Sequence, residues 1–126
     1  MSWTWSDAWV LTAAYVTGGN PADLSDVVAA GDHINHSIFT VDELEHAFSR
    51  LTAVGLAEID GDVITLTADA IALCRGAVDP VRQVLKATDN VDQALRQIEL
   101  EELVPVTIDP ATVRAATERY RRRLGV

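Results

Sequence analysis

The stretch from residue 39 to residue 67, FTVDELEHAFSRLTAVGLAEIDGDVITLT, constrains the fold of this chain more than any other part. Thr40 stands three positions before Glu43, which is the capping-box pattern of a helix start. The pattern predicts a helix over residues 41–54. Apolar residues at three- and four-residue spacing give this helix one face that must be buried. These residues are Leu44, Ala47, Phe48, Leu51 and Val54.

A β-hairpin is predicted directly after this helix. Gly55 stands where a left-handed C-terminal cap would end the helix. Two short β-prone runs, residues 57–59 and 63–66, are separated by Asp60-Gly61-Asp62, a sequence typical of tight turns. Thr67 is then predicted to cap a further helix. The local order is therefore helix, hairpin, helix.

Two more helices are predicted before this stretch. Ser6 is a suitable N-cap for a helix over residues 7–17, which Gly18-Gly19 would end. Asn20 is then predicted to cap a second helix with Pro21 at its first position, because proline loses nothing there. The second helix is expected to end near Asn35.

The later part of the chain is predicted to be helical. Gly76 is a natural stop for the helix that begins at Thr67, and Asp79-Pro80 would start the next one. Apolar residues at helical spacing predict another helix over residues 91–103, and Asp109-Pro110 would start the last one. The inner face of the Asp79-Pro80 helix would consist of Val81, Val84 and Leu85. The stripe of the last helix would consist of Val113, Ala116, Tyr120 and Leu124.

Composition favours one domain over residues 1–126. With 126 residues, of which 48% are hydrophobic, the chain can bury a core without disulfides or metals. Residues 1–76 would form the core, and residues 77–126 a helical extension that packs on the core or on a second copy. The first residues lack a secretory signal and no stretch reaches the roughly 20 apolar residues of a membrane span, so we expect a cytoplasmic protein.

The predicted order of elements resembles the winged helix-turn-helix family over about residues 6–75. The third helix starts with Thr-x-x-Glu-Leu and ends in RLTAVGL, and the phrase VITLTADA resembles the ending that commonly follows the wing. Ala70 stands where that ending usually has glycine. The resemblance implies a mostly α, α+β fold with a two-stranded wing around Asp60-Gly61, a second helix at residues 21–35 and a recognition-type helix at residues 41–54.

Charge argues against the DNA binding that this resemblance implies. The formal net charge is −9, and residues 1–74 contain eleven acids and one base, Arg50. DNA affinity depends mainly on contacts of Lys and Arg with phosphates. We therefore predict that the outward face of the third helix contacts proteins. This face would carry Asp42, Glu43, Glu45, His46, Ser49 and Arg50, and the wing would add Glu58, Asp60 and Asp62.

The preferred interpretation is a non-enzymatic protein that acts through protein contacts and associates with itself through its late helices. The alternative is a transcriptional regulator that contacts nucleic acid through a C-terminal arginine cluster. Alternatively, the arginines of this cluster complement the helix dipole and pair with the acidic body. The cluster consists of Arg114, Arg119, Arg121, Arg122 and Arg123.

A third candidate function is a metal-dependent hydrolase that uses Asp32, His33 and His36, but we predict that the chain is not an enzyme. Asp32, His33 and His36, with His46 one helix later, are the one cluster suited to a metal or to acid–base chemistry, but a structural zinc site normally has four ligands. Their other use would be as a helix cap and surface groups. Cys74, in helical register with apolar neighbours, is predicted to be a buried thiol. The sequence has no phosphate-binding glycine loop, nucleophile elbow or Cys-x-x-Cys, so no cofactor is expected.

Overall fold

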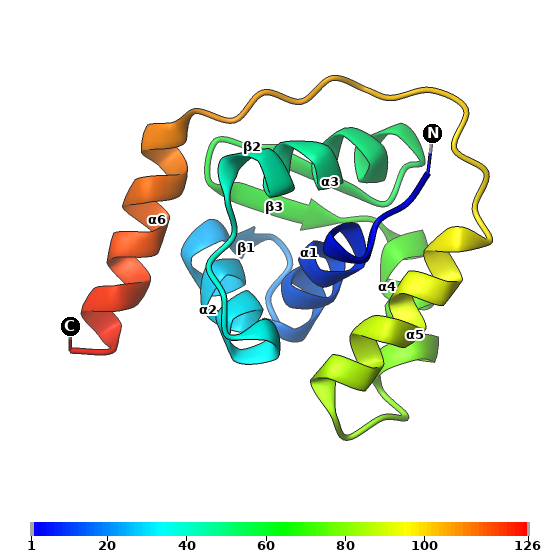
Figure 1. Cartoon of the computed structure of the whole chain (residues 1–126), viewed down its shortest axis with the longest axis horizontal. Helices are drawn as coiled ribbons and strands as arrows, with labels where there is room; N and C mark the ends of the chain where they lie inside the picture. Colours follow the sequence, from blue (N-terminus) through cyan, green and yellow to red (C-terminus); the bar gives the residue numbers. More distant parts are fainter. Residues whose placement is uncertain (1, 126) are drawn as a thin grey trace.

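The structure is a computed structural model that describes residues 2–125, and it is a mostly helical α+β fold (Figure 1). Within this range lie six helices and a three-stranded antiparallel sheet. In chain order the elements are α1 (Trp5–Val16), β1 (Ala22–Asp23), α2 (Leu24–Asn35), α3 (Val41–Ala53), β2 (Ala57–Asp60), β3 (Val63–Leu66), α4 (Ala68–Val78), α5 (Val84–Arg96) and α6 (Pro110–Arg123).

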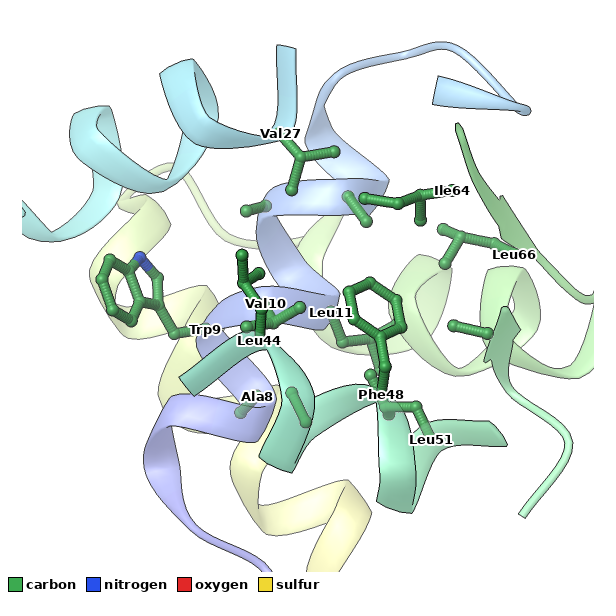
Figure 2. Packing of buried hydrophobic residues seen from close by; sticks show 14 of the residues in the cluster. Ala8, Trp9, Val10, Leu11, Val27, Leu44, Phe48, Leu51, Ile64 and Leu66 are labelled. Atoms are coloured by element: carbon green, nitrogen blue, oxygen red, sulfur yellow. The ribbon is translucent and has the colours of Figure 1, made fainter. Parts of the chain in front are cut away.

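Helix α1 lies at the centre of the molecule. It contacts α2, α3, α4 and α5, and every residue from Asp7 to Ala14 is buried. A helix that is apolar around its whole circumference must be covered on all sides. Figure 2 shows Trp9, Val10 and Leu11 of α1 among side chains from α2, α3 and β3. The other elements are therefore arranged around α1.

The three tryptophans near the N-terminus join α1 to later parts of the chain. The indole N–H of Trp9 donates to the Gly31 carbonyl at 2.9 Å, and that of Trp3 donates to the Ile98 carbonyl at 3.0 Å. Trp5 is partly buried and its N–H donates to Asp89 Oδ1 at 2.8 Å. Trp3 and Trp9 are core residues.

Helix α1 begins earlier than predicted. Thr4, not Ser6, is its N-cap, and the first helical residue is Trp5. The Asp7 carboxylate accepts a hydrogen bond from the Thr4 backbone N–H at 2.8 Å, which satisfies a donor that the helix itself leaves free. The acid at the third helical position therefore decides where the helix starts.

The predicted start of the second helix at Asn20 and Pro21 is wrong. The Asn20 side chain instead pairs with the backbone of Leu66, donating to its carbonyl at 2.9 Å and accepting from its N–H at 2.8 Å. The chain then forms β1, and Asp23 caps α2 by accepting from the Ser25 N–H. Contact with β3 thus replaces the helix cap that the local sequence favours.

The predicted third helix and hairpin are confirmed. Thr40 and Glu43 form the reciprocal capping box at 3.1 Å and 2.9 Å, and Gly55 adopts a φ of 72° at the C-terminal end of α3. Strands β2 and β3 pair around the turn at Gly61, with Ala57 opposite Leu66. The two-residue strand β1, which pairs with the other edge of β3, was not predicted because two residues show no periodicity.

The prediction for the chain beyond residue 76 is partly wrong. Helix α4 continues through Gly76 to Val78, and Asp79-Pro80 starts no helix. One helix, α5, replaces the two predicted ones, because the face that carries Val91 and Leu95 is buried in the core and α5 packs on α1 and α4. Leu85, predicted to face inward, is 51% exposed.

The last helix is confirmed from Asp109-Pro110 onward. Asp109 caps α6 by accepting from the Ala111 N–H at 2.9 Å, and Pro110 occupies the first helical position. Val113 and Ala116 are buried and Tyr120 is partly buried, whereas Leu124, predicted on the same stripe, is 59% exposed.

The segment that leads to α6 runs along α3. In the described part of the chain, residues 97–109 form neither helix nor strand, and we name them the strap. The strap crosses the outer side of α3 and leads to α6, which packs on α2 (Figure 1). The helical extension thus contacts the core of its own chain.

Two helical glycines, Gly31 and Gly76, test how tightly the core is packed around them. A Cβ atom on Gly31 would lie 2.5 Å from Cζ of the buried Phe39 ring, whereas one on Gly76 would meet no atom within 4 Å. We expect Gly31→Ala to lower the free energy of unfolding by about 1–3 kcal/mol through overpacking. Gly76→Ala should raise it by about 0.5–1 kcal/mol, because alanine is the better helix former. Urea denaturation measures both, and equal stability of the two variants would contradict the packing around Gly31.

Candidate functional site

The outer face of α3 is the first candidate site. Of the six residues predicted to form a contact face there, Asp42 is exposed, Ser49 is buried, and Glu43, Glu45, His46 and Arg50 are partly buried. The Glu43 carboxylate is used in the capping box of α3. Most of this face is therefore engaged by the chain itself.

The strap covers one side of the α3 face. The Val104 N–H donates to the Ser49 carbonyl at 3.1 Å, and the Val106 N–H donates to Ser49 Oγ at 3.0 Å. The Ile108 N–H donates to Glu45 Oε2 at 2.6 Å. Alternate backbone N–H groups of the strap thus face α3, as in an extended strand, and find acceptors on Glu45 and Ser49.

The N-terminus covers the other side of the α3 face. Asp7 is fully buried, its Oδ1 lies 2.7 Å from Nδ1 of His46, and its Oδ2 lies 3.9 Å from Nε of Arg50. The Arg50 guanidinium also donates to the Ser2 carbonyl at 3.2 Å. A buried carboxylate is stable only with such partners. His46 and Arg50 therefore hold α1 against α3 through their contacts with Asp7.

The arginines of α6 form the second candidate site. Nη2 of Arg119 lies 3.2 Å from Asp23 Oδ1 and 3.4 Å from Asp62 Oδ2, and Nη1 of Arg123 lies 2.7 Å from Asp26 Oδ1. Of the remaining arginines, Arg122 approaches Glu118 on the same helix at 3.9 Å, and within residues 2–125 no ion pair joins Arg114 or Arg121. Two of the five arginines thus bridge α6 to the acidic body.

The Asp23 carboxylate shows the electrostatic effect of this bridge. Its partial burial raises its pKa, but hydrogen bonds from Ser25 and the charge of Arg119 outweigh burial and hold the pKa below its ordinary value. The carboxylate is therefore held in its charged form, in which it caps α2 and pairs with α6.

The residues suggested for a metal site are used elsewhere. Asp32 Oδ2 accepts a hydrogen bond from the Tyr120 hydroxyl at 2.6 Å, and the N–H of His36, which has a φ of 52°, donates to the Asp32 carbonyl. His33 and His36 are exposed, and His46 is bound to Asp7. Between residues 2 and 125 no group of three or more His, Cys, Asp or Glu side chains could hold a metal ion.

The Tyr120–Asp32 contact escaped the sequence prediction. The hydrogen bond to Asp32 raises the pKa of Tyr120, and burial and the carboxylate charge add to this effect. The neighbouring ion pairs of α6 did have a sequence signal, because Arg119 and Arg123 are four residues apart and Asp23 and Asp26 are three apart. Each pair repeats at helical spacing, so each can line one face of a helix or its cap.

Cys74 is buried, as predicted. Burial raises the pKa of its thiol to about 12, so the thiolate needed for nucleophilic chemistry does not form near neutral pH.

Comparison of the chain with the models of known protein families, with curated proteins and with solved structures found no match. Function therefore has to be inferred from the residues themselves. Among the helices of residues 2–125, none combines the length and the apolar character needed to cross a membrane.

The role of Asp7 can be tested by its removal. Asp7→Ala leaves His46, Arg50 and the Thr4 N–H without their acceptor, so we expect the free energy of unfolding to fall by about 2–4 kcal/mol. Asp42→Ala is the matched control, because it removes an exposed acid from the first turn of α3 and should cost only about 0.5 kcal/mol. Urea denaturation distinguishes them, and similar losses would mean that the buried carboxylate does not join α1 to α3.

The Tyr120–Asp32 contact predicts a pH dependence. Because the pKa of Tyr120 is raised above the ordinary value of 10.0, its stabilising effect is complete below about pH 10 and is lost as the pH rises through the folded-state pKa. The chain has two tyrosines, and the pKa of Tyr15 is also raised, by its hydrogen bond to Asp79. In Tyr15→Phe, ultraviolet absorbance should show Tyr120 titrating above pH 10 when folded and near pH 10 in urea. The same midpoint in both states would rule out the contact.

Proposed function

We propose that this chain is a non-enzymatic winged-helix protein that acts through protein–protein contacts, of which self-association is one. Three helices followed by the β2–β3 hairpin, with the capping box at Thr40 and Glu43, support the winged helix-turn-helix assignment. In that assignment α3 is the recognition-type helix and the turn at Gly61 is the tip of the wing.

The observation that carries the proposal is the cover over α3. In winged-helix proteins that bind DNA, the outward face of this helix enters the major groove. Here Glu45 and Ser49 on that face accept three backbone N–H groups of the strap. Insertion of α3 into a groove would first have to break these hydrogen bonds, and it would leave their acceptors facing DNA phosphates.

The charge of this surface also argues against DNA binding. Asp42 on α3, and Glu58, Asp60 and Asp62 on the hairpin, are exposed acids. Arg50 faces the buried Asp7, so it cannot offset them at a phosphate. A surface of this sign repels nucleic acid and favours encounter with a basic protein surface.

Exposed apolar side chains suit a protein contact. Leu103 and Val104 of the strap are both exposed and line a surface groove of about 460 Å³ together with Val54 and Ile98. Acids of the strap, among them Glu101 and Glu102, border the same groove. An apolar centre with a charged rim is the usual composition of a protein interface.

The test is light scattering of the protein alone and with a random-sequence duplex DNA at low salt. We expect a mass that increases with protein concentration toward a dimer, and no complex with DNA, although low salt favours any phosphate-driven binding. A salt-sensitive DNA complex would overturn the proposal in favour of a regulator that uses the α6 arginines.

A charge variant separates the two obstacles to DNA binding. Asp42→Lys/Asp60→Lys reverses exposed charge on α3 and on the hairpin and leaves the strap contacts in place. If the strap covers the recognition face, this variant should gain at most weak, non-specific affinity. Tight, sequence-dependent binding by the variant would mean that the face of α3 is accessible.

A further inference from the structure

We propose that the acidic face of α2 is a docking site for a basic amphipathic helix, and that its partner is α6 of a second copy of this chain. Two copies would then associate by exchanging their C-terminal arms, which comprise the strap and α6. This inference deepens the self-association in the proposed function and rests on it.

The apolar part of the docking contact is small and is confined to one side of α6. Val113, Ala116 and Thr117 are buried, and Tyr120 is partly buried. The helix packs against α2, and the main helix–helix contacts of α1 and α5 do not involve it (Figure 1). One helix face thus receives α6, and the remaining core is built without it.

Charge complementarity surrounds this apolar contact. Helix α6 carries five arginines and one glutamate, whereas the receiving surface carries four aspartates. Arg119 reaches Asp23 and Asp62, and Arg123 reaches Asp26. These aspartates are Asp23, Asp26 and Asp32 around α2, and Asp62 in the hairpin turn. The face therefore selects a basic helix with a tyrosine at the position of Tyr120, which donates to Asp32.

The strap can carry α6 to another copy. It is extended and forms no regular element, and Pro105 within it has no N–H to join a ladder. Its links to α3 are backbone donors to Glu45 and Ser49, which every copy presents identically. An exchanged arm would therefore make in trans the same contacts that it makes in cis, which is the condition for domain swapping.

Concentration decides between the closed monomer and the exchanged dimer. The tether holds α6 near its own α2 at an effective concentration of millimolar order, so the arm closes on its own chain when the protein is dilute. Exchange increases as the protein concentration rises, or when contacts in cis are made unfavourable. The second condition provides a direct experiment.

Two full-length variants with reversed charges test the exchange. One variant carries Arg119→Asp and Arg123→Asp on α6, and the other carries Asp26→Arg and Asp62→Arg on the receiving surface. In each variant alone, like charges meet at these positions, in cis and between identical copies. In an equal mixture, positions 119 and 123 of each α6 meet opposite charge at positions 62 and 26 of the other variant, whereas Asp23 stays acidic in both variants. We expect the mixture to form a 1:1 heterodimer, with a two-fold rise in mass over either variant alone.

Two controls accompany the mixture. A chain with all four substitutions restores opposite charges in cis and should have the parent's mass at the same concentration. The heterodimer should dissociate in about 1 M salt, where the Debye length is about 3 Å. If a double variant does not fold by circular dichroism, the milder pair Arg123→Asp and Asp26→Arg replaces it.

The outcomes separate the two proposals. If folded variants keep their separate masses after mixing, arm exchange is wrong. If each variant alone associates as the parent does, self-association uses another surface, and the proposed function stands without arm exchange. If neither the parent at any concentration nor the mixture associates, self-association itself is wrong.

Discussion

The burial of α1 sets the positions of the elements that pack around it. A helix that is apolar around its whole circumference needs cover on every side, and α2, α3, α4 and α5 supply it. The one charge in its buried stretch, Asp7, is stabilised by His46 and Arg50 of α3 and by the N–H of Thr4. The same contacts fix the start of α1 and its position against α3.

This arrangement determines which surfaces remain for function. Because His46 and Arg50 hold Asp7, and Glu45 and Ser49 hold the strap, the outward face of α3 stabilises the fold of its own chain. The side chains of Glu45, His46, Ser49 and Arg50 are thereby occupied by contacts within the chain. The acidic surface that remains is suited to a basic partner, and α6 is such a partner within the chain.

The C-terminal arm connects these two features. Its strap completes the cover of α3, and its α6 offsets part of the acidic charge of α2 and the hairpin through Arg119 and Arg123. These pairs are partly exposed, so each adds little stability and is screened by salt. An element held by a small apolar contact and a few exposed, screened ion pairs can leave its site more easily than one held by a large apolar core. This is why its exchange between copies is a physical possibility that charge reversal can test.

The elements with local signals could be predicted from the sequence: the capping box of α3, the turn at Gly61 and the start of α6 at Asp109-Pro110. In each, the residues that set the conformation lie within a few positions of one another. Two outcomes could be seen only in the three-dimensional fold: Asn20 pairs with Leu66 instead of capping a helix, and the strap lies on α3. Those outcomes depend on contacts between residues 46 to 63 positions apart, which no local pattern records.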